Sequence, residues 1–499
     1  MEAEPVESTV ARIPGAGAMR VRRVADCIWE VPPTEKAGMR VPARIYASGA
    51  LLARMDQGVF EQVTNVACLP GIVRAALCMP DGHWGYGFPI GGVAAFRADG
   101  GIISPGGIGF DINCGMRLIR TDLTEDDVRP RLTELVDALF AAVPAGVGSR
   151  GFVTLTHEDL REVMREGAGW CVRHGYGWPE DLDYIEARGC LPGADPDSVS
   201  PRARERGLQQ LGTLGSGNHY LEIQVVRPEG LHDAALARRL GIHGPGQILV
   251  MLHCGSRGFG HQVGTDYLRL FDGAMRRYGI TVHDRELACA PFRSPEGQAY
   301  FAAMAAAANT AFANRQVITH RVREVMSRVF GVEPRRLGLS VVYDVCHNTA
   351  KLEQHRVEGE LVDLLVHRKG ATRAFGPGMP DVPAAYRELG QPVIIGGSME
   401  TGSALLVGTA TAMAETFGST AHGAGRTMSR HEAKRRVSGR KLLAQMAGRG
   451  IVVRAASRGG VAEEAGFAYK DLDAVVDVLH RLDISRKVVS LTPIGNVKG

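Results

Sequence analysis

The 499-residue sequence has no apolar run long enough to cross a membrane, and its first thirty residues contain no apolar core of a signal peptide. It also lacks any CxxC pair, because its nine cysteines are scattered from Cys27 to Cys346. An odd, scattered set does not fit a disulfide framework and favours a reducing compartment. We therefore expect a cytoplasmic protein with no membrane partner.

A strong excess of charge of either sign is also missing, since the formal net charge is only +4. Many nucleic-acid binders are more basic, so this balance is compatible with RNA binding but does not argue for it. The basic run His431–Lys441 is the candidate for a local basic face, although it equally fits a solvated helix face. No GxxxxGK[ST] motif occurs, which disfavours an ordinary P-loop NTPase.

The sequence does have a hydrophobic content of 45%, enough for a large core. The apolar spacing predicts helices over Thr124–Val143, Gly264–Tyr278, Pro295–Val329 (one helix or two) and Leu472–Leu482. It predicts strands over Val341–Val345, Leu361–His367, Pro392–Ile395, Ala404–Gly408, Ile451–Ala455 and Lys487–Leu491. Helices and strands do not alternate regularly, which favours an α+β fold over a doubly wound parallel sheet. Residues 1–20 are polar and predicted to be mobile.

Four short segments, three of which contain glycine, carry residues that can bind metal. These residues are Asp111 and Cys114 in the first segment, then His219, His253 and His347 in the other three. A carboxylate, a thiolate and three imidazoles can serve two divalent ions, with the sulfur bridging them. Ligand softness alone favours zinc for such a set. Taken singly, each residue also fits a plain structural role, such as a small buried cysteine or a hydrogen-bonded core histidine.

The segment Ser419–Arg426 contains the candidate nucleophile, His422. Two glycines flank Ala424, and a turn of this kind can expose backbone N–H groups that form an anion-binding nest. Arg426 can pair with a phosphate. A histidine beside a nested phosphate, without a Walker lysine, suggests covalent phosphoramidate chemistry, although a general-base histidine in a glycine-rich turn fits as well. The glycine–serine turn Ile395–Ser403 can supply further donors to a nucleotide.

Together these segments resemble the RtcB family of RNA ligases, and the resemblance spans nearly the whole chain. The matching segments are Gly38–Pro42, Met79–Gly91, Gly109–Arg117, Gly212–His219, Asp284–Pro291, His347–Asn348, His367–Arg373, His422–Arg426 and Gly495–Gly499. The resemblance implies a single large ligase domain over residues 21–499, with mixed central β-sheets flanked by helices.

The resemblance also implies a role for each matching site residue. His422 becomes guanylylated, and Cys114 bridges two manganese ions, with His253 and His347 on one ion and Asp111 and His219 on the other. The residues implied to bind the guanine nucleotide are Asn218, Glu222, Ser398, Met399, Ser403, Gly423, Ala424, Gly425, Arg426, Tyr469 and Lys498. Arg257, Lys369 and Arg426 are implied as phosphate or RNA contacts.

The implied activity is GTP- and manganese-dependent joining of RNA 2′,3′-cyclic phosphate or 3′-phosphate ends to 5′-hydroxyl ends, in tRNA splicing or RNA repair. The expected partners are GTP and cleaved tRNA or other broken RNA, and the need for an archease-type activator is left open. Two positions depart from the family pattern: Glu400 stands where the family usually has glycine, and Cys346 stands where the family more often has a smaller residue. Two alternatives remain: a metal-dependent phosphoesterase that does not need GTP, and a divergent RNA-binding repair factor that does not ligate.

Overall fold

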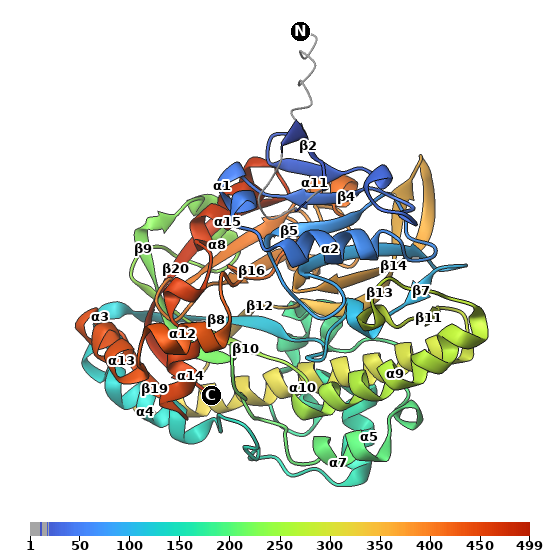
Figure 1. Cartoon of the computed structure of the whole chain (residues 1–499). Coiled ribbons are helices and arrows are strands. Elements are labelled where there is room, and N and C mark those ends of the chain that lie inside the picture. Colours follow the sequence, from blue (N-terminus) through green and yellow to red (C-terminus); the bar gives the residue numbers. More distant parts are fainter. Residues whose placement is uncertain (1–9, 12–16, 18) are drawn as a thin grey trace.

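The computed structural model describes residues 10–11, 17 and 19–499 (Figure 1). Most of the segment 1–20, predicted to be mobile, lies outside the described residues, so that prediction is not tested. Two large β-sheets form the centre of the molecule, and helices cover them. Within the described ranges, no helix is both long and apolar enough to span a bilayer.

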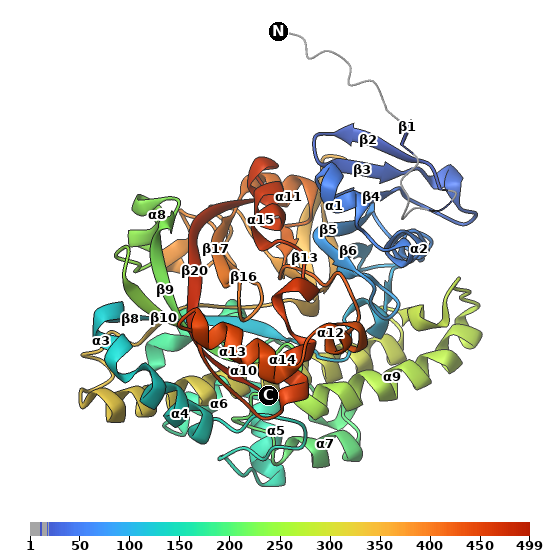
Figure 2. The ribbon, with the colours of Figure 1, turned by 60° about the vertical axis from the view of Figure 1, so that its left-hand side comes forward.

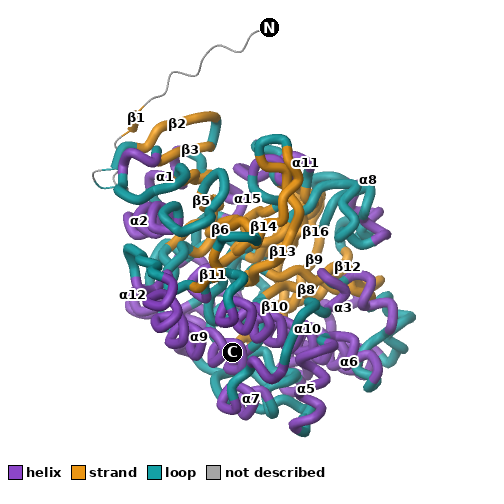
Figure 3. The backbone as a smooth tube through the Cα atoms, turned by 90° about the vertical axis from the view of Figure 1, so that its right-hand side faces the viewer, coloured by secondary structure: helices purple, strands orange, loops and turns teal. Residues whose placement is uncertain are grey.

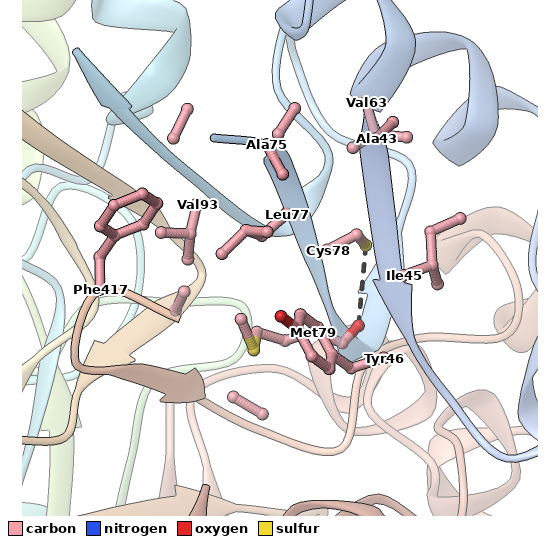
Figure 4. Close-up of a cluster of buried hydrophobic side chains, with 14 of the residues drawn as sticks. Ala43, Ile45, Tyr46, Val63, Ala75, Leu77, Cys78, Met79, Val93 and Phe417 are labelled. Carbon is pink, nitrogen blue, oxygen red and sulfur yellow. Dashed lines mark hydrogen bonds between the residues drawn. The ribbon is translucent and has the colours of Figure 1, made fainter. Parts of the chain in front are cut away.

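The first large sheet carries the N-terminal strands, in the order β1-β2-β3-β4-β5-β6-β14-β13. Its strands are β1 Val10–Ala11, β2 Val21–Ala25, β3 Ile28–Val31, β4 Ala43–Tyr46, β5 Ala76–His83, β6 Ile90–Arg97, β13 Asn348–Val357 and β14 Glu360–Lys369. Only β4 and β5 pair in parallel. Apolar side chains of β4, β5 and β6 pack with Val63 and Phe417 in a buried cluster (Figure 4).

The second sheet runs in the order β12-β8-β10-β9-β20-β17-β16, with β19 added in parallel to β20. Its strands are β8 Gly115–Thr124, β9 Tyr220–Leu231, β10 Gln247–Cys254, β12 Ser340–Cys346, β16 Pro392–Gly396, β17 Ser403–Gly408, β19 Val452–Ala455 and β20 Ser485–Lys498. The edge strands β12 and β16 lie side by side, so the sheet curls into a nearly closed antiparallel barrel. Figure 2 shows the C-terminal strand β20 running between β9 and β17.

Long helices pack on one side of these strands (Figure 3). The longest, α10, spans Pro295–Phe330 as one uninterrupted helix. Its first turn is capped by the Ser294 hydroxyl and begins with Pro295, and it ends at Gly331 in the left-handed conformation. The second long helix, α9, spans Arg257–Tyr278 and ends at Gly279 in the same way.

Shorter elements complete the fold. The remaining helices are α1 Gly49–Ala53, α2 Gln57–Val66, α3 Glu125–Val128, α4 Leu132–Ala142, α5 His157–Glu166, α6 Ala168–Arg173, α7 Pro201–Gly207, α8 Ala234–Arg239, α11 Ala410–Glu415, α12 Arg430–Arg436, α13 Gly439–Gly448, α14 Arg458–Glu463 and α15 Leu472–Arg481. The remaining strands are β7 Ile102–Ile103, β11 Ala290–Pro291, β15 Ala371–Arg373 and β18 Ser419–Ala421.

The predicted α+β class is confirmed, and each predicted strand overlaps an observed one. The helix predicted over Thr124–Val143 is divided by a 3-10 turn at Arg129–Arg131. Pro130 lies in that turn, and a proline has no backbone N–H to continue the helical hydrogen bonds. The last strand is longer than predicted, because β20 continues to Lys498 beside β9.

A buried cluster of charges joins β12, β13 and β15 to the segment before the long helices. The carboxylate of Glu186 contacts Lys351 and lies 3.1 Å from Arg373 Nε. It also accepts a hydrogen bond from the Cys346 amide at 2.9 Å. Burial opposes ionisation, but the two cations and this amide lower the pKa of Glu186 to about 2. The carboxylate is therefore ionised at neutral pH and holds two buried cations.

We expect Glu186→Gln to lower the free energy of unfolding at pH 7 by about 3–5 kcal/mol, since it leaves buried cations without an anion. In the parent protein, ionised Glu186 stabilises the folded state fully above the pKa of an unfolded glutamate, about 4.3. This stabilisation is lost as the pH falls toward about 2, the pKa of Glu186 in the folded protein. Urea unfolding measures the difference. The matched control is Glu388→Gln, which alters an exposed pair with Arg239 and is expected to leave stability unchanged. Equal stability of Glu186→Gln and the parent would contradict this interpretation.

Candidate active site

A cavity of about 240 Å³ is lined by residues from both large sheets and from the turns that follow β16 and β18. Of the predicted site residues, those lining it are Asp111, Cys114, Asn218, His253, His347, Ser398, Met399, His422, Gly423, Ala424, Gly425, Arg426, Tyr469 and Lys498. Residues more than 380 positions apart in the sequence therefore meet at one place. Three predicted residues, His219, Glu222 and Ser403, are buried next to the cavity without lining it.

The five predicted metal ligands form a continuous chain of contacts with the cysteine in the middle. The Cys114 sulfur lies 3.3 Å from His219 Nε2 and 3.1 Å from His253 Nε2. On one side, His219 Nε2 lies 2.8 Å from Asp111 Oδ2. On the other, His253 Nε2 lies 3.2 Å from His347 Nε2. Cys114, His219 and His253 alone form a buried group that can hold a metal ion.

The long helix α10 fixes the loop that carries the cysteine. Arg315 Nη1 donates to the carbonyl oxygens of Asn113, at 2.8 Å, and Cys254, at 3.0 Å. Asp344 in turn holds the same guanidinium, with Oδ1 2.9 Å from Arg315 Nη2. The loop itself closes when the Cys114 amide donates to Asp111 O at 3.0 Å. This support places the sulfur beside the histidines on the other strands.

The neutral state of two histidines suits a cation at this place. Burial lowers the pKa of His253 and of His347, so both imidazoles are neutral at pH 7. Burial raises the pKa of the Cys114 thiol well above its ordinary value, so the sulfur ionises only when a positive charge stands beside it. His253 Nδ1 lies 3.1 Å from Asn218 O, and donating its proton there leaves the Nε2 lone pair facing the sulfur. Neutral imidazoles can donate a lone pair to a metal ion, and binding of the ion would release the proton of the thiol. Both properties fit a metal site.

His422 follows β18 directly, and a buried aspartate on β5 orients its ring. Asp81 Oδ2 lies 2.6 Å from His422 Nδ1 and also accepts from the amides of His422, at 3.2 Å, and Gly423, at 3.3 Å. With the Nδ1 proton donated to this carboxylate, Nε2 is left free as a nucleophile. The ring centre lies 4.8 Å from that of His347, which places His422 beside the metal-ligand chain.

The predicted anion-binding nest is wrong for two of its amides. The Gly423 amide donates to Asp81, and the Ala424 amide donates to Gly396 O at 2.9 Å. The turn instead packs tightly against β5, where a Cβ at Gly425 would lie 2.0 Å from Asp81 O. Gly425 also has a φ of +76°, which favours glycine. The glycines therefore allow His422 to approach Asp81, rather than presenting these amides to a phosphate.

A buried carboxylate, Glu464, organises the basic end of the cavity. It lies 3.3 Å from both Arg426 Nη1 and Arg430 Nε, and it accepts a hydrogen bond from the Tyr469 hydroxyl. The Arg426 guanidinium lies 5.0 Å from the centre of the Tyr469 ring. Both arginines and the tyrosine line the cavity. Two cations and an aromatic ring beside a histidine are groups that can bind a nucleotide.

The C-terminal strand β20 forms another wall of the cavity. Lys498 pairs with Tyr220 across β20 and β9, and its Nζ lies 5.5 Å from the Tyr220 ring centre. Glu222 lies behind this wall and accepts from Gln224 Nε2 at 2.7 Å. Burial raises the pKa of this carboxyl. Ser403 donates to Gln224 at 3.0 Å, so Glu222 and Ser403 are linked to each other through one glutamine.

The residues expected to contact phosphate or RNA are not all in the cavity. Arg426 lines it, as described above. Arg257 Nη1 lies 2.8 Å from His219 Nδ1, so this arginine packs against a predicted metal ligand. Lys369 donates to Gly106 O at 3.2 Å outside the cavity lining, and burial lowers its pKa to about 7. The two residues lie around the site, and neither reaches the cavity directly.

The lining or supporting residues that were not identified from the sequence include Asp81, Arg430 and Glu464. Asp81 stands inside the segment Met79–Gly91, which was used for the family resemblance without a role for the aspartate. Arg430 immediately precedes the basic run that was noted. Glu464 has no signal in the local sequence that distinguishes it from any surface glutamate.

Comparison with known proteins gives a consistent result. The family model described as tRNA-splicing ligase RtcB matches residues 62–499. The chain is 53% identical over 479 residues to the tRNA-splicing ligase RtcB of Archaeoglobus fulgidus, covering 96% of this chain and 99% of that protein. It is 54% identical over 480 residues to the protein of the same name from Thermococcus kodakarensis, again covering 96% and 99%. The chain therefore belongs to the RtcB family of RNA ligases, as its ordered motifs predicted.

Proposed function

We propose that this chain joins RNA 2′,3′-cyclic phosphate or 3′-phosphate ends to 5′-hydroxyl ends, using GTP and manganese, through a guanylate carried on His422. One observation carries the proposal. An imidazole with a free Nε2 lines the same cavity as a chain of five potential metal ligands, and its ring centre lies 4.8 Å from that of His347. Nucleophile and cations can therefore act on one phosphate.

The metal-binding part of the proposal rests on the order of the contacts. Cys114 lies between two pairs, Asp111 with His219 and His253 with His347. Asp111 and His219 would hold one ion, His253 and His347 would hold the other, and the Cys114 sulfur would serve both. Thiolate and imidazole by themselves favour zinc, and manganese is proposed because of family membership. When bound, such ions neutralise the charge that builds up on a reacting phosphate.

In the first proposed step, His422 Nε2 attacks the α-phosphorus of GTP. An N–P bond forms, the bond from that phosphorus to the bridging oxygen breaks, and pyrophosphate leaves. The ring becomes positively charged as it gains this bond. Asp81, at 2.6 Å from Nδ1, holds the remaining ring proton and stabilises that charge. Arg426 and Arg430 line the cavity and can neutralise the phosphates.

In the later steps the guanylate moves to RNA. Water opens a 2′,3′-cyclic phosphate to a 3′-phosphate. An oxygen of this phosphate attacks the phosphorus on His422, the P–N bond breaks, and an RNA 3′-pp-5′-G end results. The 5′-hydroxyl of the second RNA then attacks the 3′-phosphorus, its proton is lost, and GMP leaves. Capping the phosphate with GMP supplies a good leaving group, so one hard displacement becomes several easier ones.

The guanosine is proposed to lie at the end of the cavity lined by Ser398, Met399, Tyr469 and Lys498. Asn218 lines the cavity close to the metal ligands, where it can contact a phosphate. Glu222 and Ser403 stand behind the wall and would take part only if side chains rearrange when the nucleotide binds.

Cleaved tRNA or other broken RNA is the proposed substrate, with an archease-type protein as a proposed activator. Family membership supports the RNA substrate. All nine cysteines are free thiols, which supports the proposal of a cytoplasmic location.

The direct test is ligation of an RNA ending in a 2′,3′-cyclic phosphate to an RNA with a 5′-hydroxyl. We expect a joined product with GTP and manganese together, and none when either is left out. Opening of the cyclic phosphate without GTP, and without ligation under any condition, would favour the phosphoesterase alternative. Binding of RNA with neither reaction would favour a non-ligating repair factor.

Asp81→Asn tests how His422 is oriented. The amide can no longer hold the Nδ1 proton as an anion does, so the ring loses its charge partner and its fixed tautomer. We expect the rate of guanylate transfer to the protein to fall about 10²–10⁴-fold, with little change in GTP affinity. Single-turnover kinetics with labelled GTP measures both quantities. A variant that reacts at the parental rate would show that Asp81 is not needed to orient the histidine.

A further inference from the structure

We propose that Glu400 is a positioning residue that holds two walls of the nucleotide end of the cavity together. The proposal rests on the proposed function, because it assumes that this end binds the guanine nucleotide. Glu400 lies in the turn between β16 and β17. It is absent from the cavity lining, so it acts through the residues that it holds and does not touch the nucleotide.

The Glu400 carboxylate reaches across to the segment before Tyr469. Its Oε2 accepts a hydrogen bond from the Gly466 amide at 2.6 Å. Its Oε1 lies 3.1 Å from Arg449 Nη1, and Arg449 Nη2 also donates to the Glu400 backbone oxygen at 3.0 Å. The side chain is 18% exposed, and its charge is compensated by Arg449. This glutamate therefore does not present an uncompensated negative charge to a phosphate.

Both the turn that carries Glu400 and the segment at Gly466 are hydrogen-bonded to residues that line the cavity. On the turn side, Ser398 accepts from the Glu400 amide at 3.2 Å and shares a 3.0 Å hydrogen bond with Thr401, which makes the turn rigid. On the other side, the Tyr469 amide donates to Gly466 O at 3.1 Å. Ser398 and Tyr469 both line the cavity. One carboxylate thus sets the distance between two walls that come from separate parts of the chain.

The catalytic groups are held by other contacts. His422 is fixed by Asp81 on β5, and Cys114 by the loop that Arg315 supports. Loss of the Glu400 carboxylate should therefore loosen the nucleotide pocket and leave the chemistry intact once the pocket is filled. This separation between binding and rate distinguishes a positioning role from general damage to the fold.

The experiment measures the dissociation constant for GTP and the rate of guanylate transfer at saturating GTP, in the parent and in variants. For Glu400→Ala we expect the dissociation constant to rise about tenfold, because the hydrogen bond from the Gly466 amide and the ion pair with Arg449 are both lost. The saturated rate should stay within about twofold of the parental rate. Glu400→Gln keeps an acceptor for the Gly466 amide, and we expect a rise of only about threefold. Arg449→Ala removes the ion pair and the hydrogen bond to the Glu400 backbone oxygen but keeps the hydrogen bond from Gly466, and we expect a similar, small effect.

The matched control is Glu388→Ala, which breaks an exposed pair with Arg239 outside the cavity lining. It should leave both measurements unchanged. Unchanged or tighter GTP binding in Glu400→Ala would overturn the proposal, as would a large fall in the saturated rate with normal affinity. If Glu400→Ala does not fold, the same two measurements on Glu400→Gln and Arg449→Ala test the proposal. Unchanged GTP affinity in both variants would overturn it. A parent protein that takes no guanylate from GTP would instead contradict the proposed function itself.

Discussion

His422→Ala is expected to take up no guanylate from labelled GTP and to lose RNA ligation by about 10⁴-fold or more, the scale of losing a covalent nucleophile. The side chain supplies the only atom proposed to bond to the α-phosphorus, and alanine has no nitrogen to replace it. The ring lies on the cavity wall in contact with Asp81, so its loss opens space next to solvent without disrupting a core cluster. The variant should therefore fold and still bind manganese.

The measurement is radiolabel retained on denatured protein after incubation with GTP labelled at the α-phosphate, together with the ligation assay. The control is His243→Ala, since His243 lies outside the cavity lining with a side chain that is 62% exposed. It should match the parent in both assays. A guanylate adduct that persists in His422→Ala would assign the nucleophile to a different residue.

Cys114→Ala is expected to have the second large effect, the loss of both metal binding and ligation. The sulfur is the central member of the ligand chain, in contact with His219 and His253. Removing it takes one ligand from each proposed ion at once. We expect manganese affinity to fall by more than about 100-fold, because removing even an outer partner of a metal ligand costs about 10–100-fold. Guanylate transfer and ligation should both fall below detection.

Equilibrium dialysis followed by elemental analysis measures the bound metal. Cys289→Ala provides a matched control, because Cys289 is also a fully buried cysteine but belongs to a hydrophobic cluster. It should cost some stability and leave the metal content unchanged. Parental ligation by Cys114→Ala, or equal metal loss in both variants, would remove Cys114 from the site.

The elements predicted correctly from sequence are those with a strong local pattern. The alanine-rich run from Pro295 forms one helix with a serine cap and a terminal glycine, all visible in the sequence. The β20 strand was predicted too short, because its last residues mix the apolar Ile494 and Val497 with proline, glycine and polar residues, and they become a strand only through pairing with β9. Tertiary partners of this kind leave no trace in local periodicity.

The same distinction between local pattern and tertiary contact applies to the residues of the candidate site. Cys114 and the histidines were found because motifs mark them, whereas their contact depends on strand register and on Arg315, which no motif marks. Asp81 was missed because a lone buried aspartate looks like a turn residue until its partner is known. The nest at Gly423 was predicted from glycine spacing, and it fails because the Asp81 carboxylate takes that amide.

The most direct test of the central claim is a crystal structure of the protein with manganese and GTP, recorded with anomalous scattering from manganese. We expect two anomalous peaks flanking the Cys114 sulfur, one near Asp111 and His219 and the other near His253 and His347. We also expect continuous density from His422 Nε2 to a phosphate. Manganese peaks away from these five side chains, or a guanylate attached to any other residue, would contradict the claim.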